Sequence, residues 1–308
     1  MIYMQGREIG LIGLGKMGKN IAMQMHNKKY DVVVWNRSKD PVRELEKSGI
    51  RSTETVKQMV ETLKGNRTIW VMLPSGDVTV EFVTDLIKIM QKGDTIIDGS
   101  NSFYKESSML HSKAKENGIE YLDAGCSGGP SGALNGMSIM VGGDREVFDR
   151  YEELFKDLSV KEGYLYTGKA GSGHFVKMAH NAIEYGMMQA IGEGLELIEE
   201  GPYKGDTDLV KVCKLWNNGS VIRGYLMELA ERALAKDKHL SSIVPYVQDN
   251  GEGRYAVHTA IDYDVPLGII TNSLYTRFES RSDKKFQRRM LAALRHEFGG
   301  HDVKTEEK

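Results

Sequence analysis

The stretch EIGLIGLGKMG at residues 8–18 decides the fold, because it joins an apolar run to three glycines at fixed spacing. The run 8–12 is typical of a buried strand, and residues 16–29 have the apolar spacing of a helix. Between them, the first glycine permits a tight turn, the second lets backbone approach a pyrophosphate, and the third lets the helix pack on the strand. The pattern predicts a dinucleotide site, with the pyrophosphate at the helix N-terminus. Its candidate cofactor-binding residues are Gly13, Leu14, Gly15, Met17 and Gly18.

The first half of the chain alternates β-rich runs with amphipathic helical stretches, which indicates βαβ units and a mostly parallel, doubly wound sheet covered on both faces. From about Ser172 onward the pattern is nearly all helical. The sequence therefore predicts an α/β dinucleotide-binding domain of Rossmann type over 1–169 and an all-α domain over 170–308. The expected strands lie within 8–13, 30–36, 67–73, 94–100, 119–124 and 138–143, and the expected helices within 16–29, 38–49, 77–93, 103–118 and from Asp144.

Composition narrows the class of protein. The 308 residues include 41 basic and 43 acidic ones, and a net charge of -2 gives no field for binding nucleic acid or an anionic membrane. Two cysteines, Cys126 and Cys213, are too few for a disulfide framework or a cysteine-based zinc site. No apolar run is long enough to span a bilayer, and no basic-then-apolar leader is evident. We expect a cytoplasmic protein with ordinary thiols and no nucleic-acid or membrane partner.

The end of the second strand selects the dinucleotide. An NAD site usually has Asp or Glu there, bonded to the ribose 2′-hydroxyl. This chain instead has Asn36, Arg37 and Ser38, while Asp31 lies at the start of the strand. A guanidinium beside two neutral polar groups suits a 2′-phosphate. We therefore expect NADP, with NAD as the alternative.

Two other segments follow strands and should lie near the cofactor, because ligands of open α/β sheets bind outside the carboxyl ends of the strands. VMLPSG (71–76) contributes Met72 and Leu73, and IIDGSNS (96–102) contributes Ser100 and Asn101. Plain turn chemistry explains both segments equally well.

A helix beginning at Gly173 carries an unusual polar stripe. Lys177, His180, Asn181, Glu184 and Tyr185 fall on one face, and apolar residues nearly surround that face. The pattern predicts a buried helix, where ionisable groups are costly unless they are paired or used. The alternative is an internal Lys–Glu pair, but a spacing of seven residues exceeds the three or four at which helical pairs normally meet. We interpret the stripe as functional.

A second glycine-rich stretch, DAGCSGGPSGALNGMSIMVGG (123–143), reads as a loop. In it Ser127, Gly128 and Gly129 present a hydroxyl group and bare backbone N–H groups, which suit a carboxylate or a hydroxyl ligand.

Taken together, these motifs closely resemble the 6-phosphogluconate dehydrogenases, decarboxylating enzymes of the pentose phosphate pathway within the β-hydroxyacid dehydrogenases. GxGxxG, NRS, DGSNS, CSGG, GHFVKMAHNAIEYG and LRHEFGGH occur in the family's order between Gly10 and His301, and the length is that of the family's short form. The resemblance implies oxidative decarboxylation of 6-phosphogluconate to ribulose 5-phosphate and CO2, without a metal ion.

The resemblance also implies roles for single residues. Lys177 is the expected general base and Glu184 the general acid, and Tyr185 and Arg277 are expected to bind the 6-phosphate. In the family an Arg and a His of the neighbouring subunit complete the pocket, which implies a homodimer or homotetramer with shared active sites. The candidate substrate-binding residues are Asn101, Ser127, Gly128, Gly129, His180, Asn181, Tyr185, Arg277, Arg295 and His301, and Asn101 is also a candidate for the cofactor.

One segment departs from the family pattern. Where long-form members have KGTGK near the phosphate, this chain has NGEGR (250–254), so Asn250 and Glu252 replace a lysine and a threonine while Arg254 keeps the later basic position. Glu252 beside a dianion costs about 1–4 kcal/mol at 4 Å, depending on the local dielectric. An unphosphorylated sugar acid therefore stays an alternative substrate. Two other readings also stay open: a non-decarboxylating dehydrogenase of the 3-hydroxyisobutyrate type, and a catalytically silent NADP-binding sensor.

Overall fold

The computed structural model describes residues 8–304 of the chain. These divide into two compact units, Met1–Ile183 and Glu184–Lys308, and the division falls inside one long helix. The predicted domain boundary at 169/170 stays a prediction; in the structure it lies between the last strand, which ends at Gly168, and this helix, which begins at Ser172.

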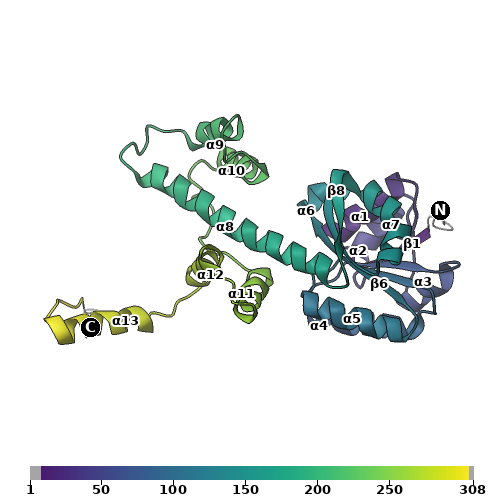
Figure 1. The fold of residues 1–308 in the computed structure, drawn as a ribbon. Coiled ribbons are helices and arrows are strands. Elements are labelled where there is room, and N and C mark those ends of the chain that lie inside the picture. Colours follow the sequence, from purple (N-terminus) through teal and green to yellow (C-terminus); the bar gives the residue numbers. More distant parts are fainter. Residues whose placement is uncertain (1–7, 305–308) are drawn as a thin grey trace. The chain divides into compact units, whose positions relative to one another are not determined.

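The first unit is built on one sheet (Figure 1). Its described strands run in the order β3-β2-β1-β4-β5-β6-β7-β8. Neighbours are parallel except for β6 and β7, which are antiparallel. The predicted doubly wound α/β class is confirmed. The strands are β1 (Glu8–Ile12), β2 (Asp31–Trp35), β3 (Arg51–Ser52), β4 (Thr68–Val71), β5 (Thr95–Asp98), β6 (Glu120–Ser127), β7 (Met137–Gly143) and β8 (Ser159–Gly168).

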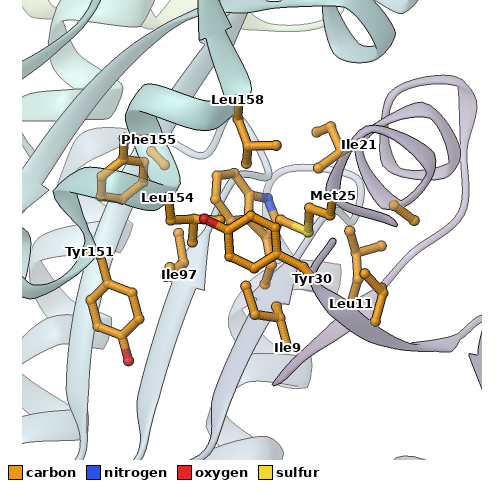
Figure 2. Packing of buried hydrophobic residues seen from close by; sticks show 14 of the residues in the cluster. Ile9, Leu11, Ile21, Met25, Tyr30, Ile97, Tyr151, Leu154, Phe155 and Leu158 are labelled. Atoms are coloured by element: carbon orange, nitrogen blue, oxygen red, sulfur yellow. The ribbon is translucent and has the colours of Figure 1, made fainter. Parts of the chain in front are cut away.

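Helices cover both faces of this sheet, because side chains alternate between the faces along each strand. Ile9 and Leu11 of β1 pack on the face covered by α1 and α7 (Figure 2), whereas Ile12 packs on the face covered by α3, α4 and α5. Figure 1 shows the same two layers. The helices are α1 (Lys16–Asn27), α2 (Asp40–Glu46), α3 (Val56–Thr62), α4 (Asp77–Ile89), α5 (Tyr104–Glu116), α6 (Gly129–Asn135) and α7 (Arg145–Leu158).

Some of these elements were not predicted: β3, α3, α6 and β8. The glycine-rich stretch 123–143 is not one loop, because Ser127 ends β6, Gly128 adopts a left-handed conformation with φ 119°, and α6 begins at Gly129. Glycine hides this short helix in the sequence, although Pro130 is compatible with its first turn. β8 lies at the edge of the sheet, so it is mostly half-buried or exposed and has no continuous apolar run.

The second unit contains only helices among its described residues, which confirms the predicted all-α class for this part of the chain. The 29-residue α8 (Ser172–Glu200) begins in the first unit and continues into the second. A small apolar core of Leu209, Cys213, Met227 and Leu234 packs against Ile191 and Leu195 of α8. The other helices are α9 (Leu209–Asn217), α10 (Tyr225–Lys236), α11 (Glu252–Asp262), α12 (Gly268–Ser280) and α13 (Phe286–Gly299).

Within residues 8–304, none of the helices combines the length and the hydropathy that crossing a bilayer requires.

The glycines of the β1–α1 turn differ in how much room they have. Gly13 has φ 93°, and a Cβ on it would lie 2.2 Å from the Met72 carbonyl oxygen. A Cβ on Gly18 would lie 1.9 Å from the Gly13 carbonyl oxygen, so helix α1 can pack on the turn only with glycine there. By contrast, a Cβ on Gly15 would have no neighbour within 4 Å, and Gly15 has an ordinary φ of -66°.

These contacts predict a clear loss of stability for one alanine substitution and almost no change for another. Gly18→Ala is expected to lower the free energy of unfolding by about 1–3 kcal/mol, because the new methyl group meets rigid backbone. Gly15→Ala is expected to change it by less than about 0.5 kcal/mol. Urea unfolding of the cofactor-free protein measures both, and equal stabilities of the two variants would contradict this account of the turn.

Candidate active site

The turn after β1 and the end of β2 are joined by Asn36. Its Oδ1 accepts a hydrogen bond from the Leu14 backbone N–H at 2.9 Å, and its Nδ2 donates to the carbonyl and hydroxyl oxygens of Ser38, each at 2.9 Å. Among the described residues, no side chain caps the N-terminus of α1 at Gly15, which suits the binding of an anion by the first N–H groups of the helix. Asn36 therefore holds the β1–α1 turn against the end of β2.

Arg37 and Ser38 are the predicted ligands of a 2′-phosphate. They follow β2 and are exposed to solvent. The nearby Lys39 forms an ion pair with Glu54. Asp31 lies at the other end of the strand, as the sequence indicates, where it pairs with Arg51 at 2.7 Å. No carboxylate occupies positions 36–38, which fits a site for a phosphate.

Met72 and Leu73 meet the glycine turn. The Met72 N–H donates to the Ile12 carbonyl at 2.8 Å, and the Leu73 N–H donates to Ser100 Oγ at 3.1 Å. Both residues lie directly against the position of the missing Gly13 side chain. The structure thus brings together the predicted cofactor-side segments after β1, β4 and β5.

A buried carboxylate, Asp98, arranges the loop after β5. It accepts hydrogen bonds from the Ser100 N–H at 2.9 Å, from Ser102 Oγ at 3.3 Å and from the Tyr121 hydroxyl at 2.7 Å. Burial, and then the charge of Asp98, raise the pKa of Tyr121 well above its usual value, so this phenol stays a donor. The loop holds Asn101 in a left-handed conformation with φ 57°.

The neighbouring carboxylate, Asp123, fixes the start of α8. Asp123 is the register partner of Asp98 across β5 and β6, and both side chains are fully buried. Its Oδ1 accepts from the Gly171 N–H at 2.7 Å and its Oδ2 from the His174 N–H at 2.9 Å. A carboxylate at a helix N-terminus satisfies unpaired N–H groups and complements the helix dipole. Sequence reasoning missed Asp123, although an Asp inside the apolar run IEYLDAGC is a visible signal.

The same strand brings α8 unusually close to the sheet. A Cβ on Gly125 would lie 2.4 Å from Cβ of Lys177, and a Cβ on Gly173 would lie 2.5 Å from the Met140 carbonyl oxygen. Because these positions are glycine, the helix lies directly on β6 and β7. The stem of Lys177 is consequently buried, with 6% of the residue exposed.

The amino group of Lys177 lies among three predicted site residues. Its Nζ donates to Asn181 Oδ1 at 2.7 Å and lies 3.4 Å from His180 Nδ1. His180 Nε2 is 3.0 Å from Ser127 Oγ, which joins the stripe on α8 to the end of β6. The structure therefore assembles Ser127, Lys177, His180 and Asn181 into one hydrogen-bonded cluster, with Gly128 and Gly129 adjacent to Ser127.

The thiol of Cys126, next to this cluster, is not activated as a nucleophile. Burial raises the pKa of its thiol to about 12, and Lys177 opposes the shift only in part. At neutral pH the group is therefore a thiol and not a nucleophilic thiolate.

The prediction that apolar packing surrounds the polar stripe is wrong. Lys177, Asn181 and Tyr185 are less than 9% exposed, whereas the apolar Ile183 is 56% exposed and Met187 is 50% exposed. The polar stripe is the buried face, because in the first unit it packs on β6 and in the second it packs on Gly253. The outer face of α8 is apolar and uncovered in the single chain.

Tyr185 and Arg277 come together within the second unit. The Arg277 guanidinium lies 3.6 Å from the centre of the Tyr185 ring, and its Nη1 donates to the Gln248 carbonyl at 2.9 Å. Burial and then the charge of Glu252 raise the pKa of Tyr185, while a hydrogen bond from the Asn250 backbone opposes them. Glu252 is itself buried at the start of α11.

The remaining predicted residues lie on helices of the second unit or follow them. Glu184 is half-buried on α8, seven residues after Lys177 along the same helix. Arg295 is exposed on α13, and His301 is exposed beyond its end, where its carbonyl oxygen accepts from His296 Nδ1 at 2.9 Å. In the part of the chain that the structure describes, no group of three or more His, Cys, Asp or Glu side chains is placed to hold a metal ion.

Two family models match nearly the whole chain. Residues 8–168 match the NAD binding domain of 6-phosphogluconate dehydrogenase, and residues 173–308 match the C-terminal domain of 6-phosphogluconate dehydrogenase. Fold and matches together define an oxidoreductase with an NAD-binding domain, which confirms the predicted dinucleotide cofactor. The chain belongs to the 6-phosphogluconate dehydrogenase family.

Similar proteins support this assignment. The chain is 48% identical to the Bacillus subtilis protein YqeC, for which 6-phosphogluconate dehydrogenase is a provisional name, over 96% of this chain and 98% of that protein. It is 38% identical to the NAD(+)-dependent, decarboxylating 6-phosphogluconate dehydrogenase of Haloferax volcanii, with coverage of 96% and 98%. A solved structure of Plasmodium falciparum 6-phosphogluconate dehydrogenase, described as apo and in complex with NADP+ and with 6-phosphogluconate, aligns with TM-score 0.80 and 29% identity over 97% of this chain and 66% of that one.

The Asp123 carboxylate is expected to position Lys177 through the start of α8. Asp123→Asn keeps one acceptor oxygen, so it should lower the free energy of unfolding by about 1–3 kcal/mol and lower kcat about tenfold to hundredfold. Asp157→Asn makes the same substitution at the acceptor of the Tyr30 hydroxyl hydrogen bond elsewhere in the same unit, so it is the matched control and should spare kcat. Urea unfolding and steady-state kinetics measure these effects; a wild-type kcat in Asp123→Asn would show that this anchor does not set the geometry of Lys177.

Proposed function

We propose that the chain is a decarboxylating 6-phosphogluconate dehydrogenase that converts 6-phosphogluconate to ribulose 5-phosphate and CO2 in the pentose phosphate pathway. The observation that carries the proposal is the hydrogen-bonded cluster in which the buried Lys177 and Asn181 of α8 meet the half-buried His180 and, through it, Ser127 of β6. A buried amino group held by neutral polar partners suits proton transfer at a hydroxyl-bearing carbon.

Dinucleotide binding falls to the residues after β1, β2 and β4. The α1 N-terminus and Gly13–Gly18 suit the pyrophosphate, and Arg37 with Ser38 suits a 2′-phosphate. When bound, the nicotinamide supplies the acceptor for a hydride from the substrate. Asn101, on the loop that Asp98 arranges, is assigned to the nicotinamide and the substrate together.

Lys177 has two roles in the proposed reaction. Its neutral amine takes the proton of the C3 hydroxyl while C3 loses hydride, which gives a 3-keto acid with the carboxylate β to the new carbonyl. The resulting ammonium then donates a proton to the C3 carbonyl oxygen as the C1–C2 bond breaks and C1 leaves as CO2, so the electron pair of that bond forms the C2=C3 double bond of an enediol. Ser127, His180 and Asn181 orient the hydroxyl groups and the carboxylate around this amine.

Glu184 completes the reaction by protonating the enediol carbon that was C2 of the acid. This carbon becomes C1 of ribulose 5-phosphate. Glu184 follows Lys177 by two turns of α8, so one helix carries both groups. Tyr185 and Arg277 are assigned to the 6-phosphate, because the guanidinium already lies against the phenol ring.

The proposed enzyme works as a homodimer or homotetramer with shared active sites. Arg295 and His301 would enter the site of a neighbouring subunit. The uncovered apolar face of α8 and the exposed Phe286, Leu291 and Leu294 of α13 support assembly, since large exposed apolar patches mark protein interfaces.

The test of the proposed function is an assay of the purified protein with 6-phosphogluconate and either NADP or NAD, following reduced cofactor and CO2 together. Equal amounts of both products are expected. Reduced cofactor without CO2 would identify a non-decarboxylating hydroxyacid dehydrogenase, and cofactor binding without any turnover would identify a silent sensor.

Lys177→Met should lower kcat about a hundredfold to ten-thousandfold, because it removes the proton acceptor and keeps a stem of similar length. The dissociation constant for NADPH, measured by fluorescence titration, should stay within twofold of wild type. Lys161→Met replaces an exposed lysine on β8 of the same unit and should leave both quantities unchanged. Substantial turnover by Lys177→Met would remove Lys177 as the base.

NADP preference is expected to depend on Arg37. Arg37→Ala should lower kcat/KM for NADP about tenfold to hundredfold, the usual effect of losing a charged hydrogen bond, and should leave kcat/KM for NAD nearly unchanged. Arg43→Ala, at an exposed arginine of α2, is the control. A wild-type preference for NAD would refute the assignment of Arg37 and Ser38 to a 2′-phosphate.

A further inference from the structure

His174, one turn before Lys177 on α8, is a buried histidine with no role in the proposed reaction. The residue is 1% exposed. Its backbone N–H donates to Asp123 Oδ2 at 2.9 Å, and its ring Nδ1 lies 2.7 Å from Ser107 Oγ on α5. The other ring nitrogen, Nε2, is also buried, and no hydrogen-bond partner for it lies within residues 8–304. Such an unpaired atom is unusual, because most buried polar side-chain atoms are paired.

Ser107 continues the hydrogen bonding from His174 toward the cofactor side of the sheet. Its hydroxyl group is hydrogen-bonded to the Tyr121 phenol, and the Tyr121 hydroxyl is 2.7 Å from Asp98 Oδ2. Ser107, Tyr121 and Asp98 are at most 1% exposed. A buried chain of side chains, His174–Ser107–Tyr121–Asp98, therefore connects α8 to the loop after β5.

We propose that His174 is a positioning residue whose Nδ1–H tautomer completes this chain, so that one residue ties α8 to both buried carboxylates of the sheet. Asp123 holds its backbone, and Asp98 holds its ring through Ser107 and Tyr121. Lys177 and the loop after β5 then keep their positions relative to each other. The consequence for turnover rests on the proposed function, whereas the tautomer and the chain do not.

The direction of each hydrogen bond follows from the carboxylate at the end of the chain. An ionised Asp98 can only accept, so the single hydrogen of the Tyr121 hydroxyl is donated to it. The phenol oxygen is then an acceptor for the Ser107 hydroxyl. Burial is the main cause of the raised pKa of Tyr121, and the charge of Asp98 adds to it, but the hydrogen bond with Ser107 lowers this pKa. A donor to the phenolate has that effect.

The same reasoning fixes the tautomer of His174. Ser107 has one hydroxyl hydrogen, and if Tyr121 receives it, Ser107 Oγ must accept from His174 Nδ1–H. The Phe103 carbonyl is a further acceptor, 3.5 Å from Ser107 Oγ, and donation to it gives the same tautomer.

The unpaired Nε2 atom agrees with this tautomer. With the proton on Nδ1, Nε2 has only a lone pair without a partner. Any form with a proton on Nε2 would leave a buried N–H group without an acceptor, which is the rarer case. The Nε2–H tautomer would also take the Ser107 hydrogen away from Tyr121, so it leaves more polar atoms unsatisfied.

The place of His174 in the fold connects this chain to the candidate site. His174 and Lys177 are three residues apart, so they lie on one side of α8. Asp98 and Asp123 are register partners on β5 and β6, so adjacent strands hold the same histidine. Asp98 also accepts the Ser100 N–H in the loop after β5. We expect a change at one end of the chain to affect the other, because buried polar networks act as units.

Two amide substitutions separate the ring nitrogens. In His174→Asn the amide nitrogen takes the place of Nδ1 and can still donate to Ser107, whereas in His174→Gln it takes the place of Nε2. Under conditions where urea unfolding shows each variant fully folded, kcat of His174→Asn should stay within about threefold of wild type, and kcat of His174→Gln should fall about tenfold to hundredfold. KM for 6-phosphogluconate should change little in both. His26→Asn and His26→Gln, at a half-buried histidine in the last turn of α1, are the controls and should match wild type.

NMR of the full-length protein with nitrogen-15-labelled histidine tests the tautomer without substrate or substitution of the chain. The ring signals of His174 are identified by their absence from the spectrum of His174→Asn. A protonated Nδ1 and an unprotonated Nε2 are expected in the wild-type protein. A proton on Nε2 would refute the tautomer and with it the chain.

A double-mutant cycle tests whether the chain acts as a unit. Tyr121→Phe removes the hydroxyl group between Ser107 and Asp98. Because Tyr121→Phe and His174→Gln interrupt one chain, the urea midpoint of the double variant should lie close to that of the less stable single variant. Tyr151→Phe removes another buried hydroxyl, 2.7 Å from Thr68 Oγ1, that shares none of these partners, so its effect should add to that of His174→Gln. Additive losses for Tyr121→Phe would contradict the chain.

The kinetic results separate failure of this inference from failure of the proposed function. A wild-type kcat in folded His174→Gln, or equal losses of kcat in His174→Asn and His174→Gln, would overturn the positioning role of Nδ1–H. If the wild-type protein does not turn over 6-phosphogluconate, the proposed reaction is refuted, while the NMR and unfolding measurements still decide the tautomer and the chain.

Discussion

The contact between α8 and the sheet depends on one interaction: the buried Asp123 carboxylate accepts hydrogen bonds from the backbone N–H groups of Gly171 and His174 at the start of α8. A buried charge is costly unless hydrogen bonds compensate it, and here the compensation comes from a helix end that needs an acceptor. The helix end thus supplies hydrogen-bond donors to the carboxylate, and the carboxylate supplies an acceptor to the helix end. Because Asp123 and Gly125 lie on the same face of β6, the strand that anchors the helix also receives the stem of Lys177.

Two register partners on neighbouring strands each hold one element of the candidate site in place. Asp98 arranges the loop that carries Asn101, and its register partner Asp123 arranges the helix that carries Lys177. Both carboxylates are fully buried and serve backbone N–H groups, which rigidifies the elements around the reacting groups. The sheet thereby fixes cofactor-side and substrate-side residues from neighbouring strands, in agreement with the rule that α/β sheets bind ligands at the carboxyl ends of strands.

Much of the fold was predictable because its signals are local. Gly18 meets the carbonyl oxygen of Gly13 in the same turn, Gly13 itself has a φ of 93°, and apolar strands alternate with amphipathic helices along the first half of the chain. α6 and β8 were missed for the opposite reason: glycine obscures the short helix, and β8 is an edge strand without an apolar run.

Sequence patterns could predict residues of the candidate site, but not the residues that hold them in place. Periodicity placed Lys177, His180 and Asn181 on one face of α8, and the structure joins them. The roles of Asp98 and Asp123 depend on contacts between residues far apart in sequence, which no local pattern encodes. The same limit explains the error about the environment of α8, since periodicity identifies distinct faces of a helix but not which of them meets the sheet.

The exposed apolar face of α8 has a thermodynamic consequence. The folded single chain keeps Phe175, Ile183 and Met187 in contact with water on the outer side of α8, so part of the hydrophobic free energy available to this sequence is not gained within one molecule. Any partner surface that covers these residues binds the folded state and not the unfolded one, and mass action then adds to stability. Where that partner surface is a second copy of the chain, the melting temperature rises with the concentration at which the protein is kept.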